Sequence, residues 1–245
     1  MIVLFTDFGL TGPYVGQMKA VLAQQAPGVP VIDLFADAPA FEPQLSAYLL
    51  AAYAPWFPPG TVFLCVVDPG VGTDERLPVA VRAGGRWFVG PGNGLFEPVM
   101  RRSPQPAEAW RIAWQPPQLS ASFHGRDLFA PVAAELATAP TVSGRLETVD
   151  PALLARPDWP DDLARIVYVD PYGNAMTGLR ASAVPGDAVL RVGGTSIAPA
   201  RTFGEVPVGC TLWYENSTGL VEIAVNRGRA AEVLGLRPGM AVDFT

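Results

Sequence analysis

The sequence has no apolar run of about 18 residues, the length needed to span a bilayer. Its start also lacks a basic segment with a cleavage site, since residues 1–5 are apolar and lead directly into an acidic turn. Lys and Arg number 17 against 23 Asp and Glu, with no basic cluster beyond Arg101-Arg102. We therefore expect a soluble, cytoplasmic protein with no membrane or nucleic-acid partner.

Cysteine and histidine are scarce. Cys65 and Cys210 both lie in apolar runs typical of strands, which favours reduced core thiols over a disulfide or a metal pair. His124 is the single histidine, and only its side chain has an unperturbed pKa near neutrality. Polar neighbours and Gly125 predict an accessible loop, although position alone leaves a structural role open.

The common nucleotide-binding motifs are absent. Residues 90–94 form a glycine-rich turn, but no Lys-Ser/Thr pair follows as in a P-loop, and the GxGxxG spacing of a dinucleotide fold is missing. These two classes of phosphate site are therefore excluded.

What is present is an alternation of strands and helices in the first 140 residues. We expect strands at 2–5, 29–34, 61–67, 78–82 and 87–89, and helices after Pro13, at 43–53 and at 126–137. This pattern predicts an α/β domain over residues 1–140, with a mostly parallel sheet flanked by helices.

The pattern changes in the last third of the chain. Residues 141–162 are rich in proline and predict a linker. Short alternating strands follow at 165–169, 188–192, 195–197, 211–215 and 220–225, with Gly193-Gly194 as a hairpin turn and helical character only at 228–236. We predict a small antiparallel, β-barrel-like domain over residues 163–245.

Two carboxylates follow predicted strands of the first domain. Asp7 and Asp68 would lie on the same rim of a parallel sheet, where such folds bind ligands. They could orient ribose hydroxyls, bind a metal, or act as acid and base. We expect no metal, since Asp7, Asp68, His124 and Asp127 form only a loose set of ligands.

Two turns of the second domain combine amide or hydroxyl groups with glycine beside an aromatic. They are Asp170-Pro171-Tyr172-Gly173-Asn174 and Asn216-Ser217-Thr218-Gly219. Both are compatible with ordinary β-turns and with contacts to a purine.

Seven blocks in chain order together resemble one known family. They are Thr6-Asp7-Phe8-Gly9, residues 14–19 (YVGQMK), 57–61 (FPPGT), 67–73 (VDPGVGT), 93–95 (NGL), 123–131 (FHGRDLFAP) and 170–174 (DPYGN). These blocks are similar to those of the S-adenosyl-L-methionine hydroxide adenosyltransferases, relatives of fluorinase and chlorinase.

The resemblance implies hydrolysis of S-adenosyl-L-methionine to adenosine and methionine, with no cofactor, in a homotrimer whose sites lie between subunits. It implies a catalytic set of Asp68, Arg76 and His124. The usual family spacing places the arginine at Glu75, and one residue inserted in the turn brings Arg76 into register. It further assigns substrate binding to Asp7, Phe8, Asn93, Asp170, Tyr172, Asn174 and Ser217.

Two alternative functions remain open at this point. A transferase of the same fold could use a halide as the nucleophile, although a halide needs donors and desolvation and not a base, so Asp68 and His124 favour water. A non-catalytic protein that binds S-adenosylmethionine or adenosine is the other alternative.

Overall fold

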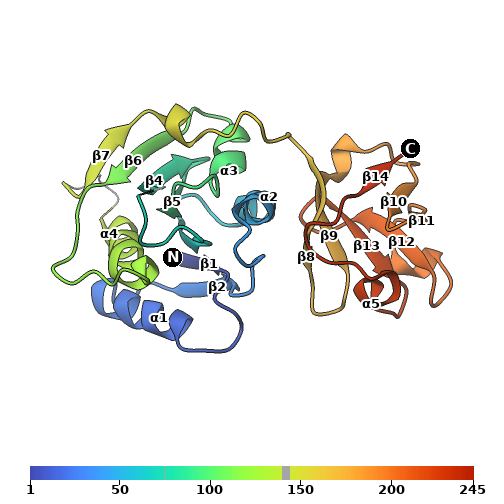
Figure 1. Cartoon of the computed structure of the whole chain (residues 1–245), viewed down its shortest axis with the longest axis horizontal. Helices are drawn as coiled ribbons and strands as arrows, with labels where there is room; N and C mark the ends of the chain where they lie inside the picture. Colours follow the sequence, from blue (N-terminus) through green and yellow to red (C-terminus); the bar gives the residue numbers. More distant parts are fainter. Residues whose placement is uncertain (75, 140–143) are drawn as a thin grey trace. The chain divides into compact units, whose positions relative to one another are not determined.

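The computed structural model describes residues 1–74, 76–139 and 144–245 of the chain. They form two compact units, Met1–Arg156 and Pro157–Thr245, each of which can be followed by its colours in Figure 1. The elements of the first unit are β1 (Ile2–Thr6), α1 (Tyr14–Gln25), β2 (Val31–Phe35), α2 (Pro43–Tyr53), η1 (Ala54–Trp56), β3 (Val62–Val66), β4 (Pro78–Ala83), β5 (Arg86–Pro91), α3 (Glu97–Arg101), β6 (Glu108–Ile112), η2 (Gly125–Phe129), α4 (Ala130–Thr138), β7 (Leu146–Val149) and η3 (Pro151–Leu154).

A seven-stranded sheet in the order β2-β1-β3-β5-β4-β6-β7 forms the centre of this unit. The pairs β1–β2, β1–β3 and β3–β5 are parallel. The pairs β4–β5, β4–β6 and β6–β7 are antiparallel. The sheet is therefore mixed. The predicted mostly parallel arrangement holds for the half formed by β2, β1, β3 and β5, whereas β4, β6 and β7 pair antiparallel with their neighbours.

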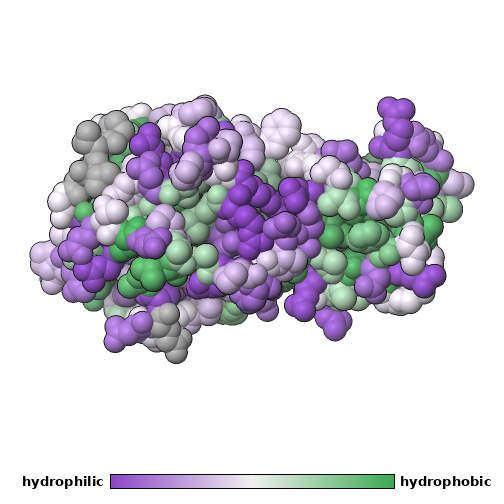
Figure 2. Space-filling view, turned by 90° about the horizontal axis from the view of Figure 1, so that it is seen from above, coloured by the Kyte–Doolittle hydropathy of each residue, from purple (hydrophilic) through white to green (hydrophobic). Residues whose placement is uncertain are grey.

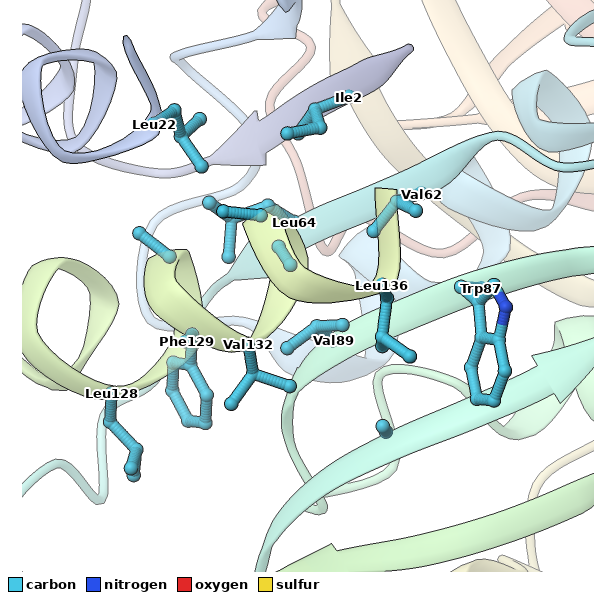
Figure 3. Close-up of a cluster of buried hydrophobic side chains, with 14 of the residues drawn as sticks. Ile2, Leu22, Val62, Leu64, Trp87, Val89, Leu128, Phe129, Val132 and Leu136 are labelled. Carbon is cyan, nitrogen blue, oxygen red and sulfur yellow. The ribbon is translucent and has the colours of Figure 1, made fainter. Parts of the chain in front are cut away.

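Helices cover both faces of the sheet (Figure 1). Alternate residues of β3, such as Val62 and Leu64, lie in a buried cluster with Phe129 and Val132, which Figure 3 shows packed between α4 and the strands. Phe63, the residue between them, points to the opposite face by the period of a strand and stacks on Phe88 at 5.0 Å. This burial on both faces explains why β3 is a continuous apolar run.

Glycine permits the closest contacts of the sheet. The β4–β5 hairpin turns at Gly84 and Gly85, with φ of 54° and 76°, as a two-residue primed turn requires. At Gly90 an added Cβ would lie 2.1 Å from the carbonyl oxygen of Cys65. No other residue allows β5 to approach β3 in this way.

The second unit is antiparallel. Its elements are β8 (Leu163–Val169), β9 (Ala175–Arg180), η4 (Ala181–Ala183), β10 (Leu190–Val192), β11 (Thr195–Ile197), η5 (Phe203–Glu205), β12 (Thr211–Glu215), β13 (Leu220–Val225), α5 (Ala230–Leu234) and β14 (Asp243–Phe244). They form one sheet in the order β12-β13-β9-β8 and another in the order β11-β10-β14. Among the described residues neither sheet closes on itself, so the antiparallel fold is confirmed and the barrel is not.

Part of the predicted linker belongs to the first unit. Residues 146–149 form the edge strand β7, paired with β6, and the first unit continues to Arg156. The predicted boundary at 140/141 lies outside the described residues. The prolines of this stretch led to the prediction of a linker. The short strand was not predicted because its pairing partner is distant in sequence.

The surface is mixed in character. On the face shown in Figure 2, hydrophobic side chains are interspersed with hydrophilic ones. Cys65 is buried as predicted, but Cys210 is exposed directly before β12 and is not a core residue. Within the described part of the chain, no helix is both long and apolar enough to traverse a bilayer.

Candidate active site

Two acidic side chains follow neighbouring strands at one rim of the first sheet. β1 and β3 are parallel with Thr6 opposite Val66, and the N–H of Asp7 donates to the carbonyl of Val66 over 3.3 Å. Asp7 and Asp68 therefore both leave the sheet at its carboxyl edge, as the strand pattern predicted.

Arg76 binds Asp68 with two donors. Its Nε donates to Oδ1 of Asp68 over 3.0 Å, and its Nη2 donates to Oδ2. Both side chains are buried, with 5% and 3% of their surfaces exposed. The guanidinium also lies 5.5 Å from the ring centroid of Phe129. A buried pair with this fork geometry holds the carboxylate in one orientation.

The same guanidinium reaches His124. Nη2 of Arg76 lies 3.1 Å from Nδ1 of His124. Because a guanidinium can only donate, Nδ1 must accept, and the proton of the neutral ring is therefore on Nε2. Arg76 thus links the predicted acid and the lone imidazole directly.

The surroundings of His124 favour the neutral ring. Burial lowers the pKa of His124, and the charge of Arg76 lowers it further, while Asp68 and Asp127 act in the opposite direction. His124 directly precedes the π-helical turn η2, an element that is frequent at functional sites.

A network on Asp127 holds the loop that carries His124. The backbone N–H of Ser120 donates to Asp127 over 2.9 Å, and Arg126 donates to both carboxylate oxygens. Arg126 also donates to Gln17 of α1 over 2.8 Å. Asp127 therefore fixes both ends of the 120–127 segment.

Asp7, Asp68 and His124 line one pocket of about 340 Å³, within the size range of small-molecule sites. Its other lining residues are mostly apolar or aromatic: Phe8, Tyr14, Phe41, Val66, Val71, Ser122, Phe123 and Gly125. Burial raises the pKa of Asp7, aided by the nearby charge of Asp68, whereas the N–H of Phe41 opposes this by donating to the carboxylate over 3.0 Å. The pocket is thus an apolar cavity with a few convergent polar groups.

Asn93 does not line this pocket. Its Nδ2 donates to the carbonyl of Val67 over 2.9 Å, and its Oδ1 accepts from the N–H of Leu95 over 3.3 Å. Both ends of the amide thus hold the backbone that precedes Asp68.

The predicted residues of the second unit lie on two turns. Asp170 accepts from the N–H of Asn174 over 2.8 Å, and Tyr172 between them is 78% exposed. Ser217 is exposed on the β12–β13 turn. Since Ala175 lies near Ile223 and Leu220 near Arg180, the two turns are at opposite ends of this sheet.

Some lining residues escaped the sequence reasoning. Phe41 is 75% exposed and has a φ of 61°, unusual for a residue other than glycine, but nothing in its local sequence indicates this. Tyr14 and Phe123 adjoin predicted site features, so proximity in sequence was an available signal. Among the described residues, no three His, Cys, Asp or Glu side chains are grouped as metal ligands.

Comparison with known proteins covers both units. Residues 2–144 match the SAM hydroxide adenosyltransferase N-terminal domain, and residues 164–243 match its C-terminal domain. The chain is 43% identical to an (R)-S-adenosyl-L-methionine hydrolase of Thermus thermophilus, over 98% of each chain. It is 24% identical to a fluorinase of Nocardia brasiliensis, over 99% of this chain and 96% of the other. The crystal structure of a conserved protein from Thermotoga maritima superposes with a TM-score of 0.85 at 31% identity, covering 100% and 99% of the two chains.

Proposed function

This chain belongs to the S-adenosyl-L-methionine hydroxide adenosyltransferase family, and we propose that it performs the family reaction at the pocket of Asp68, Arg76 and His124. The reaction is the hydrolysis of S-adenosyl-L-methionine to adenosine and L-methionine. The observation that carries the assignment of the site is the contact of one guanidinium with both Asp68 and His124 beside an apolar cavity.

The chemistry needs a water that attacks the ribose C5′ opposite the departing sulfur. The C–S bond breaks as the C–O bond forms, the sulfonium becomes a neutral thioether, and the water loses a proton. Water is a weak nucleophile, so orientation and proton acceptance contribute to the rate. A pocket with mostly apolar walls favours the loss of the sulfonium charge.

Each polar group has a separate role in this proposal. A free lone pair of Asp68 accepts the proton of the water, while Nε2–H of His124 donates to its oxygen and directs it toward C5′. Arg76 holds the carboxylate in one orientation through both of its oxygens and sets the imidazole tautomer through Nδ1. The proton then leaves Asp68 for solvent, so that the site is restored.

The substrate contacts follow from the pocket. Asp7 accepts from the ribose hydroxyls, with one oxygen held by Phe41, and Phe8 lines the same cavity. We assign to Asn93 the support of the Asp68 turn, since its amide is engaged by backbone.

We further propose a homotrimer in which Asp170, Tyr172, Asn174 and Ser217 of a neighbouring copy complete each site. The exposure of Phe41 and Tyr14 at the pocket supports a covering partner, as does the exposure of Tyr172. Co-expression of Asp68→Asn with Tyr172→Ala tests it, because a mixed trimer contains a site with neither change. Activity above that of either variant alone is expected, and its absence contradicts shared sites.

The sulfonium sulfur is a stereocentre, and the Thermus relative is named for the (R) form. We extend this preference to the present chain. Separate assays of the two epimers test it, with faster adenosine release from the (R) form as the expected result.

We place the reaction in the cytoplasm. Both Cys65 and Cys210 are free thiols, which suits a reducing compartment. Cell fractionation with an antibody to the chain tests this, and recovery outside the soluble cytoplasmic fraction contradicts it.

The main alternative is a halide as the nucleophile, given the similarity to a fluorinase. Incubation with S-adenosylmethionine and excess chloride or fluoride, followed by separation of the nucleosides, distinguishes the two. We expect adenosine alone, and its loss in Asp68→Asn. A halogenated nucleoside supports the transferase, whereas binding without turnover supports a non-catalytic protein.

A further inference from the structure

Three aromatic rings of the pocket pack against one another. Phe8 follows β1, Tyr14 begins α1 and Phe123 precedes His124. Their centroids are 5.7 Å apart for Phe8–Tyr14, 5.7 Å for Phe8–Phe123 and 5.5 Å for Tyr14–Phe123. All three line the cavity of Asp68 and His124. Mutual contacts of this kind hold the rings in fixed orientations.

The proposed substrate carries a permanent positive charge on sulfur. A sulfonium has no N–H or O–H, so it cannot donate a hydrogen bond to an acceptor of the site. Carboxylates and the π-systems of aromatic rings are favourable partners for such a cation.

The carboxylates of the pocket are already engaged. Asp68 is bound by Arg76 through both oxygens. Asp7 accepts a hydrogen bond from the N–H of Phe41. Burial raises the pKa of Asp7, which disfavours the ionised carboxylate. The third polar group, His124, is neutral and donates from Nε2. Of the carboxylates and rings of the cavity, the rings are therefore the groups still available to a cation.

One ring of the set already contacts a cation. The guanidinium of Arg126 lies over Phe123 at 5.1 Å from the centroid, and Gln17 and Asp127 fix it there. Because Arg126 takes one face of Phe123, the contact with a second cation falls mainly on Phe8 and Tyr14. Gly125 allows this packing, since an added Cβ would lie 3.4 Å from each of the rings of Phe8 and Phe123.

We infer that Phe8, Tyr14 and Phe123, here called the aromatic wall, bind the sulfonium and make the site prefer a cationic sulfonium over a neutral thioether. This inference rests on the proposed function and names what the pocket recognises. Since the sulfonium charge disappears along the reaction, the contact is strongest with the bound substrate and weaker in the transition state. Its loss must therefore raise KM without lowering kcat.

Phe8→Leu and Tyr14→Leu test the inference with two ligands that differ by one methyl group and one charge. The KM for S-adenosylmethionine is compared with the Ki of S-adenosylhomocysteine. We expect KM to rise about three- to tenfold, the size of a partly desolvated cation–π contact, with kcat and Ki changed less than about twofold. Tyr14→Phe, which keeps the ring, should have a smaller rise in KM than Tyr14→Leu. Trp56→Leu is the control that should retain the wild-type KM, since this side chain is 68% exposed and outside the pocket.

An equal rise of Ki and KM overturns the inference, because it shows that the rings supply shape alone. Tyr14 is 49% exposed, so Tyr14→Leu provides the test even if Phe8→Leu does not fold, with melting temperatures as the check. Calorimetric binding of both ligands to Asp68→Asn separates this result from the proposed function. If the wild-type protein binds S-adenosylmethionine more tightly than S-adenosylhomocysteine but releases no adenosine, the aromatic wall is retained and hydrolysis is refuted. If it releases adenosine but binds the two ligands with equal affinity, hydrolysis is retained and the aromatic wall is refuted.

Discussion

Nη2 of Arg76 donates to Oδ2 of Asp68 and lies 3.1 Å from Nδ1 of His124. One guanidinium nitrogen therefore fixes both the proton acceptor of the proposed reaction and the tautomer of its imidazole. Protonation of His124 would put a hydrogen on Nδ1 and abolish this contact. The account thus requires a neutral ring.

The pH dependence of activity follows from this requirement. Burial and Arg76 lower the pKa of His124, so kcat/KM should rise with pH through that lowered value and stay level above it. The midpoint of the acid limb is expected below the ordinary histidine value of about 6.5. Steady-state kinetics across the acid and neutral range measure it, and a midpoint at or above that value contradicts the account.

Asp7 is the control for this profile, because burial raises its pKa and places a second titration in the acid range. Asp7→Asn should weaken substrate binding and leave the limb of His124 in place. If the acid limb of kcat/KM disappears in Asp7→Asn, the group that titrates there is Asp7, and the assignment to His124 is wrong.

Arg76→Lys keeps the positive charge but loses the fork. A lysine cannot bind both oxygens of Asp68 and the ring of His124 in one plane. We expect kcat to fall about 100-fold, the effect of losing one or two charge-assisted hydrogen bonds, with the acid limb little changed. Arg82→Lys is the matched control, since that arginine is 53% exposed in a 3.7 Å pair with Glu108. Comparable losses in both variants would show that Arg76 has no special role.

Parts of this site were predictable from sequence and others were not. Asp7 and Asp68 follow apolar runs, so a parallel pair of strands was sufficient to place them on one rim. The meeting of Arg76 with His124 joins segments 48 residues apart, and only the resemblance to a family indicated it. Phe41 depends on a positive φ in a loop that has no glycine at that position.

The fold shows the same division. The hairpin at Gly84-Gly85 and the strand β3 have local signals, and both were predicted. The edge strand β7 exists because residues 146–149 pair with β6, about 35 residues earlier. The second unit likewise forms two separate sheets and not the expected barrel, because strand pairing depends on tertiary context that no local pattern specifies. Pairing between distant segments is what the sequence pattern could not supply.

Gly72 lies where the turn after Asp68 contacts the segment before His124. Its φ is 78°, and an added Cβ would lie 2.3 Å from the carbonyl oxygen of Ala121, in the segment before His124. Gly72→Ala should therefore displace the Asp68 turn, lower kcat and lower the melting temperature. Gly60→Ala is the control, because Gly60 has a φ of 84° with open space around it, and should cost only the backbone strain of about 1 kcal/mol. Equal effects of the two changes would exclude a role for the Ala121 contact.

Asp127→Asn tests how the loop of His124 is held. The amide oxygen can still accept from Ser120, but the charge that raises the pKa of His124 is lost. We expect the acid limb of kcat/KM to move to lower pH, with a modest loss of kcat from weaker binding of Arg126. A shift to higher pH would contradict the assigned electrostatics.

The most direct test of the central claim is hydrolysis of S-adenosylmethionine in water enriched in oxygen-18, with mass spectrometry of the nucleoside. The account predicts adenosine that carries the heavy oxygen in its 5′-hydroxyl, and no such product from Asp68→Asn. Release of adenine, a nucleoside without the label, or undiminished labelling by Asp68→Asn would contradict attack by a water held at this carboxylate.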